Sequence, residues 1–312
     1  MESLFLAASV VVPLVVYMAV GGLIRKMGIF TVQNFKALNI MIFKIFIPLS
    51  LFFNVYDADL GEAVKPEIFI YVMICVLLVY SVAWMIISKC IPERADASTM
   101  IQGIYRSNFV LFGTTIALSL CGQNGIALNA AMSAIVVPLF NILSVILFEI
   151  KRGRKVQTTE IIINILKNPL VEAGILGCIF SILKIHIPEL LFKPLENMSN
   201  IATPLALVTL GGMLSFGSMV RHRMYLVIVI IARLVVVPMI TISVAIWMGM
   251  RGDVLVVLLA IFASPTAVAS APMAQAMGGN GDLAGEIVAT TSVSCLFTIF
   301  LFIFSLSRMG LI

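Results

Sequence analysis

The chain carries apolar runs long enough to cross a lipid bilayer, one after another along its length. About 20 helical residues span the ~30 Å of hydrocarbon in a bilayer. Hydrophobic residues make up 61% of the chain and charged residues 11%, whereas soluble domains average about 45–50% and about 25%. No segment alternates polar and apolar residues as a transmembrane barrel strand does. The sequence therefore predicts an all-α polytopic membrane protein.

Charged residues and Pro/Gly breaks divide the apolar runs into ten predicted spans. They cover residues 4–24, 37–55, 67–90, 100–121, 126–149, 168–185, 194–216, 224–249, 254–277 and 284–308. A basic stretch, KRGRKVQTTE at 151–160, lies at the middle of the chain. We therefore expect a first five-helix repeat in residues 1–150, a cytoplasmic loop in 151–166 and a second five-helix repeat in 167–312.

The Lys and Arg residues predict how the chain is inserted, because cytoplasmic loops carry an excess of them. With both termini outside the cytoplasmic membrane, few basic residues face outward: Lys65, Lys184, Lys193, Arg251 and Arg308. The inward loops then hold Arg25, Lys26, Lys36, Lys89, Arg94, Lys151, Arg152, Arg154, Lys155, Lys167, Arg221 and Arg223. This split predicts external termini and a cytoplasmic central loop.

The two halves of the chain share a sequence register. Pro48 in IPLSL and Pro204 in TPLAL are 156 residues apart (204 − 48). The same offset aligns RSNFVLFGTTIALSLCGQNG at 106–125 with FASPTAVASAPMAQAMGGNG at 262–281, and both end in Gly-x-Asn-Gly. A repeat of five spans enters the membrane from the opposite face at its second copy. The sequence therefore predicts a 5+5 inverted repeat, an architecture of secondary transporters whose site lies at the repeat interface.

The predicted fourth and ninth spans contain residues that interrupt helices. Pro265 and Pro272 remove two amide donors in the ninth, and Gly113-Thr114-Thr115 is a plausible unwinding point in the fourth. Irregular backbone at membrane depth persists only inside protein or beside a watery cavity. We therefore expect the two spans to cross at the centre. The alternative is a pair of kinked helices packed through small residues.

Polar side chains around these interruptions are the predicted substrate-binding residues, and four prolines are the predicted helix breaks. The binding candidates are Asn108, Gly113, Thr114, Ser264, Pro265, Thr266, Ser270 and Gln275. The break candidates are Pro48, Pro204, Pro265 and Pro272.

Three basic residues, Lys44, Arg106 and Arg233, fall within predicted spans. A charge there is costly unless it finds a partner, so each is a candidate for binding a substrate carboxylate. The alternative is that their long side chains reach the headgroups. Glu172 is the one acidic residue that we expect to serve proton coupling, although it also suits a solvated helix end. Neither crossover segment contains Asp or Glu, which disfavours cation exchange.

Together these features resemble the auxin efflux carrier family, whose bacterial members include malate and malonate permeases and which is similar to the plant PIN-formed carriers. The resemblance covers about residues 5–308. It implies a sodium/proton-antiporter-like fold with scaffold and transport domains, each assembled from both repeats, and crossed fourth and ninth helices. It also implies a homodimer. Asn108 and Pro265 match the crossover of the plant carriers, whereas the fourth span lacks their proline.

The predicted function is secondary active or facilitative transport of a small organic anion, such as malate, malonate or an auxin-like acid, by elevator-type alternating access. H⁺ and Na⁺ are the candidate coupling ions. The alternative is a sodium-coupled symporter of bile-acid type for larger amphipathic anions. No catalytic motif, metal-ligand spacing or cofactor motif supports an enzyme, and the net charge of +5 needs no nucleic acid, because cytoplasmic loops explain it.

Overall fold

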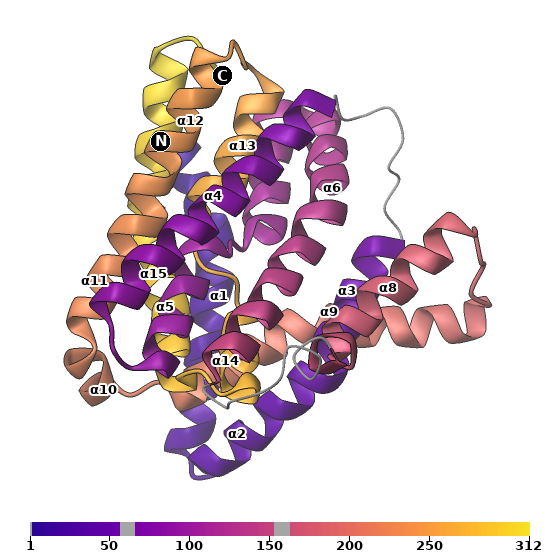
Figure 1. Cartoon of the computed structure of the whole chain (residues 1–312), viewed down its shortest axis with the longest axis vertical. Helices are drawn as coiled ribbons and strands as arrows, with labels where there is room; N and C mark the ends of the chain where they lie inside the picture. Colours follow the sequence, from indigo (N-terminus) through magenta and orange to yellow (C-terminus); the bar gives the residue numbers. More distant parts are fainter. Residues whose placement is uncertain (1, 57–65, 153–162) are drawn as a thin grey trace.

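The computed structural model describes residues 2–56, 66–152 and 163–312, and most of the predicted central loop and Lys65 lie outside them. The described residues fold into helices joined by short links (Figure 1). Five helical segments are long and apolar enough to cross a membrane: Val32–Tyr56, Pro66–Cys90, Phe109–Lys151, Arg223–Trp247 and Gly281–Arg308. Large apolar side chains such as Trp247 and Phe297 are 86% and 69% exposed. An all-α membrane protein is therefore confirmed.

The other predicted spans correspond to a single helix or to a pair of helices. Helix α1 covers Glu2–Lys26, α8 covers Pro169–Ile182 and α9 covers Glu189–Met213. The predicted fourth span is divided between α5 (Arg94–Tyr105) and the start of α6 (Phe109–Lys151), and the ninth between α13 (Asp253–Ala263) and α14 (Ser270–Met277). Since several of these helices are shorter than the about 20 residues of a full crossing, the count of ten stays a prediction.

Two of the long segments contain a π-helical turn. The first segment consists of α2 (Val32–Met41), the π turn η1 (Ile42–Phe46) and α3 (Ile47–Tyr56). The second consists of α11 (Arg223–Ile231), the π turn η2 (Ala232–Val236) and α12 (Val237–Trp247). In each, a single residue separates the wide turn from a proline, Pro48 or Pro238. A proline has no amide hydrogen and its ring crowds the preceding turn, so a π turn accommodates it without ending the helix.

The prediction that Pro48 and Pro204 break their helices is therefore wrong. Pro48 is the second residue of α3 and follows η1 without interruption. Pro204 lies inside α9, which continues as one helix to Met213. Near the end of the predicted fourth span, α6 instead turns at Gly122, whose φ of 62° suits glycine.

The helices form two groups on either side of a central cavity. The first group consists of α1 and α2, which pack against α9, and of α3, which packs against α8 and α9. The remaining helices, α4 (Pro66–Cys90), α5, α6, α10 (Phe216–Arg221), α11 to α14 and α15 (Gly281–Arg308), make up the second group. Figure 1 shows both chain termini at the same end of the molecule.

Candidate functional site

Two interrupted helices meet at the centre of the molecule. Residues 106–108 connect α5 to α6, and residues 264–269 connect α13 to α14. Ser107 and Thr266 form an antiparallel bridge. The Asn108 amide donates to the Pro265 carbonyl at 2.8 Å, and the Ala267 amide donates to the Arg106 carbonyl at 3.2 Å. The two links therefore satisfy part of each other's backbone hydrogen bonding, a requirement where water is excluded. We call this pair of links the crossover.

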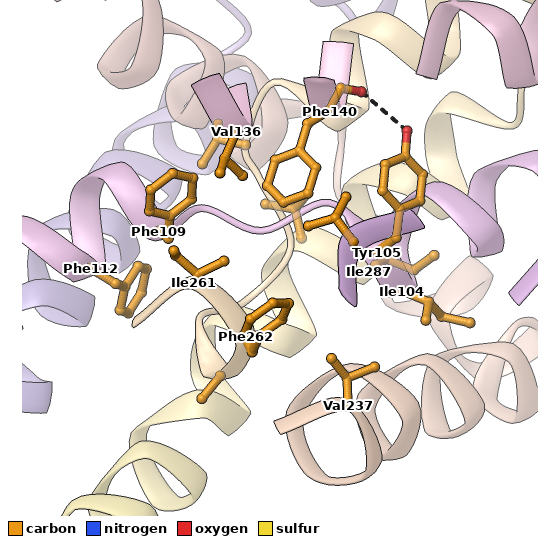
Figure 2. Packing of buried hydrophobic residues seen from close by; sticks show 14 of the residues in the cluster. Ile104, Tyr105, Phe109, Phe112, Val136, Phe140, Val237, Ile261, Phe262 and Ile287 are labelled. Atoms are coloured by element: carbon orange, nitrogen blue, oxygen red, sulfur yellow. Dashed lines mark hydrogen bonds between the residues drawn. The ribbon is translucent and has the colours of Figure 1, made fainter. Parts of the chain in front are cut away.

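Large apolar side chains enclose the crossover (Figure 2). Ile104 and Tyr105 precede the first link, Phe109 follows it, and Ile261 and Phe262 precede the second. All five are at most 5% exposed. Tyr105 also donates its hydroxyl to the Phe140 carbonyl at 3.2 Å, which joins the first link to the later part of α6. Polar groups at the crossover therefore lie in a largely dry environment, where an unmet hydrogen bond is costly.

The break in the predicted ninth span lies at Pro265, as the sequence predicts. Pro272, however, is the third residue of α14, where its missing amide hydrogen would have had no partner within the helix. It therefore does not break a helix.

The break in the predicted fourth span lies closer to the N-terminus than predicted. Gly113 and Thr114 are helical residues of α6, and the interruption is at Arg106–Asn108. A Cβ on Gly113 would lie 2.4 Å from Asn129 Oδ1, and Asn129 donates to Thr114 Oγ1 at 3.3 Å. The glycine thus permits close packing within α6. Asn108, directly before the apolar run, is the helix-start signal that marks the true position.

Arg233 binds the ends of both interrupted helices. Its guanidinium donates to the carbonyls of Ile104 (3.3 Å) and Tyr105 (3.4 Å) at the end of α5. It also donates to Ile261 and Ser264 of the α13 end, both at 2.9 Å. The C-terminal ends of helices carry partial negative charge and carbonyls without helical partners. The Arg233 side chain is 1% exposed and satisfies these carbonyls at both helix ends. The alternative that it reaches the lipid headgroups is therefore wrong.

A cavity of about 520 Å³ lies between the crossover and the first group of helices. One wall consists of the two links and α6, and the other consists of α1, α3 and α9. Its polar lining residues are Tyr17, Ser50, Asn54, Arg106, Ser107, Asn108, Thr115, Asn141, Ser199, Asn200 and Thr203. Arg106 is the charged residue among the described lining residues, and no carboxylate lines the cavity there. The cavity therefore favours an anion.

The first link presents unsatisfied polar atoms at this cavity. Arg106, 4% exposed, donates to Asn141 Oδ1 at 2.7 Å and contacts Met273 Sδ at 2.9 Å. A guanidinium has five N–H donors, so several are left for another partner. Ser107 Oγ and Asn108 Nδ2 are buried without any hydrogen-bond partner. Three consecutive residues thus offer donors that a bound ligand could satisfy.

Most other predicted site residues serve the protein's own structure. Ser264 Oγ donates to the Ala260 carbonyl, and Thr266 Oγ1 donates to the Gly103 carbonyl at 2.7 Å. Gln275 bonds Asn39 and the Lys36 carbonyl, and Ser270 Oγ is buried without a partner. None of these four lines the cavity.

Two of the predicted charge candidates are exposed and do not line the cavity. Glu172 lies in the first turn of α8, and Lys44 lies in η1. Of the predicted site residues, Arg106, Asn108 and Pro204 line the cavity.

The opposite wall was missed by sequence reasoning, although its pattern was readable. Ser50 and Asn54 on α3, and Ser199 and Thr203 on α9, line the cavity. Each pair is spaced i, i+4, so its members share one face of an otherwise apolar helix. Such a polar pair inside a predicted span is a signal for a cavity-facing surface.

Comparison with known proteins agrees with this architecture. The family model described as "Membrane transport protein" matches residues 6–303, nearly the whole chain. No curated protein sequence matches the chain. The family consists of transporters rather than enzymes, in line with the prediction that the chain is not an enzyme. A match of this extent identifies the protein as a membrane transporter that belongs to the auxin efflux carrier family.

Proposed function

We propose that the protein carries a small organic anion through the membrane and binds it in the cavity beside the crossover. The observation that carries this proposal is the first link, where the Arg106 guanidinium and the unpartnered Ser107 and Asn108 groups line one cavity. Planar guanidinium groups match carboxylates in geometry and charge. Malate, malonate and an auxin-like acid are the candidate substrates.

The size and surface of the cavity support a small rather than a large anion. Small-molecule sites measure about 300–1,000 Å³ and combine apolar walls with a few placed polar groups. The cavity, at about 520 Å³, falls within this range. Leu51, Phe140 and Leu207 supply apolar surface for a carbon skeleton. No observation on the described residues favours the symporter of larger amphipathic anions.

An elevator-type movement of one helix group against the other is the proposed mechanism. The moving transport domain would contain the crossover with α4–α6 and α10–α15, and the scaffold would contain α1–α3, α8 and α9. The cavity lies between the groups, and its charged and unpartnered donors belong to the crossover side. A displacement of that side would carry the anion with it.

The remaining predictions complete this proposal. The two domains are each assembled from both halves of a 5+5 inverted repeat, in the cytoplasmic membrane with both termini outside. Termini at the same end of the molecule support an even number of crossings (Figure 1). The protein is proposed to function as a homodimer, as the family resemblance implies.

Uptake into proteoliposomes tests the transport function. The purified protein should move labelled malate, malonate or indole-3-acetate, and Asn108→Ala should lower the rate because it removes a cavity donor. Thr114→Ala is the matched control, since Thr114 lies on the helix that follows the link, accepts a hydrogen bond from Asn129 and does not line the cavity. Absence of organic-anion transport under every ion gradient would overturn the proposal, and equal rates in the two variants would exclude the first link as the site.

A further inference from the structure

A second buried site lies away from the cavity, on α15. Glu286 is 1% exposed inside this membrane-long helix. Its Oε2 lies 2.7 Å from His222 Nδ1, and the His222 side chain is 14% exposed. An ionisable residue inside a membrane span is costly to bury and is a functional candidate. The sequence analysis predicted Glu172 as the proton-coupling residue instead, and Glu172 is exposed.

Glu286 faces a void of about 10 Å³, lined also by Asn39, Met213, Ser215 and Asp282. A void of this size holds about one water molecule. Glu286 Oε1 and Asn39 Oδ1 are both buried acceptors without a hydrogen-bond partner. One water molecule in the void has two O–H donors, enough to satisfy both acceptors, so the void can connect the buried carboxylate to solvent.

Among the charged groups on the surrounding elements, His222 is the one that pairs with Glu286. Arg25 of α1 donates to the Gly212 and Leu214 carbonyls, Arg233 of η2 is committed to the crossover, and Asp96 of α5 accepts from Asn280. Helix α14 contains no charged residue. The other described charged groups on these elements are exposed, or lie on the first half of α9 away from the void: Lys26, Lys36, Lys44, Asp282, Arg94, Arg221, Arg223, Asp253, Arg308, Glu189, Lys193 and Glu196. Tyr225 stacks on the His222 ring.

The void lies where the two helix groups touch. Asn39 belongs to α2 and Met213 to α9, whereas Ala271 belongs to α14 and Glu286 to α15. Beside the void, Asn39 Nδ2 donates to Gln275 Oε1 at 2.8 Å, which joins α2 to α14. A relative movement of the two groups would therefore open the void to water and change the solvation of Glu286.

From this placement we propose that Glu286 and His222 form the proton-binding site that couples proton movement to anion transport. The inference rests on the proposed transport function. In the unloaded pair, neutral His222 donates its Nδ1 hydrogen to the Glu286 carboxylate, and the pair has a net charge of −1. A solvent proton adds to His222 Nε2, and the Nδ1 hydrogen can pass to Glu286 Oε2. The loaded pair is neutral.

Burial decides when the proton is held. An unpaired charge buried in a low-dielectric interior is strongly disfavoured, so the closed contact holds the neutral, loaded pair. Opening of the void hydrates the carboxylate and releases the proton. One proton is thus bound and released for each movement of the transport domain.

Counterflow and gradient-driven uptake separate this inference from the transport function itself. Proteoliposomes would be tested with labelled malonate and indole-3-acetate, first by exchange at equal pH and then under an inward proton gradient with a trapped pH dye. The wild type should exchange anion, should acidify the lumen with uptake, and should accumulate anion up to about tenfold per pH unit for one-to-one coupling. Glu286→Gln should retain exchange within about twofold, since the amide is isosteric, but should lose the accumulation and the dye signal.

The controls make each outcome decisive. His222→Gln should reproduce the loss of coupling and serves as the second variant if Glu286→Gln does not yield folded protein by size-exclusion chromatography. Glu172→Gln, at an exposed carboxyl, should match the wild type. Wild-type exchange without a proton signal, or gradient-driven accumulation by both pair variants, would overturn the proton site alone. Absence of exchange by the wild type would overturn the transport function and the proton site with it.

Discussion

Two arginines inside the membrane-spanning part differ in what their guanidinium groups reach. Arg233 donates to four backbone carbonyls at the ends of α5 and α13. Arg106 lines the cavity and donates a hydrogen bond to one side-chain oxygen, Asn141 Oδ1. A buried charge is tolerated when hydrogen bonds satisfy it. Arg233 therefore stabilises the crossover, and Arg106 is the residue with donors available to an anion.

Replacement of Arg106 should weaken substrate binding. Arg106→Gln removes the cavity's positive charge, and a hydrogen bond to a charged group contributes about 1.5–3 kcal/mol, or about 10- to 100-fold in half-saturation concentration. Proteoliposome uptake over a range of anion concentrations measures this. Arg106→Lys keeps the charge but loses the planar guanidinium, so its half-saturation concentration should lie between those of the wild type and Arg106→Gln. An unchanged half-saturation concentration in Arg106→Gln would argue against an anion at this position.

Replacement of Arg233 should instead lower stability. Arg233→Met leaves four buried carbonyls without their donor, and loss of one side of a buried charged network costs about 3–5 kcal/mol. Thermal unfolding in detergent should show a clear fall in Tm. Lys44→Met is the control, because Lys44 is exposed and should change Tm little. Equal unfolding temperatures for the two variants would contradict the stabilising role.

Close contact between helices α1 and α9 depends on glycine. A Cβ on Gly21 would lie 1.8 Å from the Val208 carbonyl oxygen, and one on Gly211 would lie 1.9 Å from the Met18 carbonyl oxygen. Small residues permit such backbone approach between membrane helices. Helices α1 and α9 are therefore packed backbone to backbone at these positions.

A glycine-to-alanine substitution should push α1 and α9 apart only where the added methyl group collides with the backbone of the other helix. Gly21→Ala should destabilise the protein by about 1–3 kcal/mol, the usual cost of overpacking. Gly22→Ala should have little effect, because its Cβ would lie 3.8 Å from the nearest atom, the Gly211 carbonyl oxygen. Thermal unfolding of the two variants provides the comparison. A greater loss of stability in Gly22→Ala would show that the packing differs from this description.

At the scale of the whole molecule, the proposed elevator mechanism requires the two helix groups to move relative to each other where α2 meets α14. Asn39 and Gln275 are hydrogen-bonded at 2.8 Å across this contact. The pair Asn39→Cys and Gln275→Cys, in a background without the five native cysteines, should form a disulfide on oxidation. The crosslinked protein should stop transporting, and reduction should restore the rate. Undiminished transport by fully crosslinked protein would exclude an elevator movement at this contact.

The sequence by itself determined the class of protein and the approximate positions of the long apolar helices. Membrane insertion depends on the transfer of about 20 consecutive residues into hydrocarbon, so hydropathy along the chain is sufficient to predict it. Pro265 also marked one interruption correctly, because proline acts on its own backbone. Gly113 misled the other prediction, since glycine serves close packing as readily as unwinding.

Only the tertiary structure decided which residues form the sites. Ser107 meets Thr266 across the crossover, Arg233 reaches Ile104 from 129 residues away, and His222 reaches Glu286 from 64 residues away. Hydropathy and helix signals describe neighbours along the chain, whereas the role of a buried charge depends on partners that distant segments supply. For that reason the sequence predicted the same role for Arg106 and Arg233, whereas the folded protein gives them different partners.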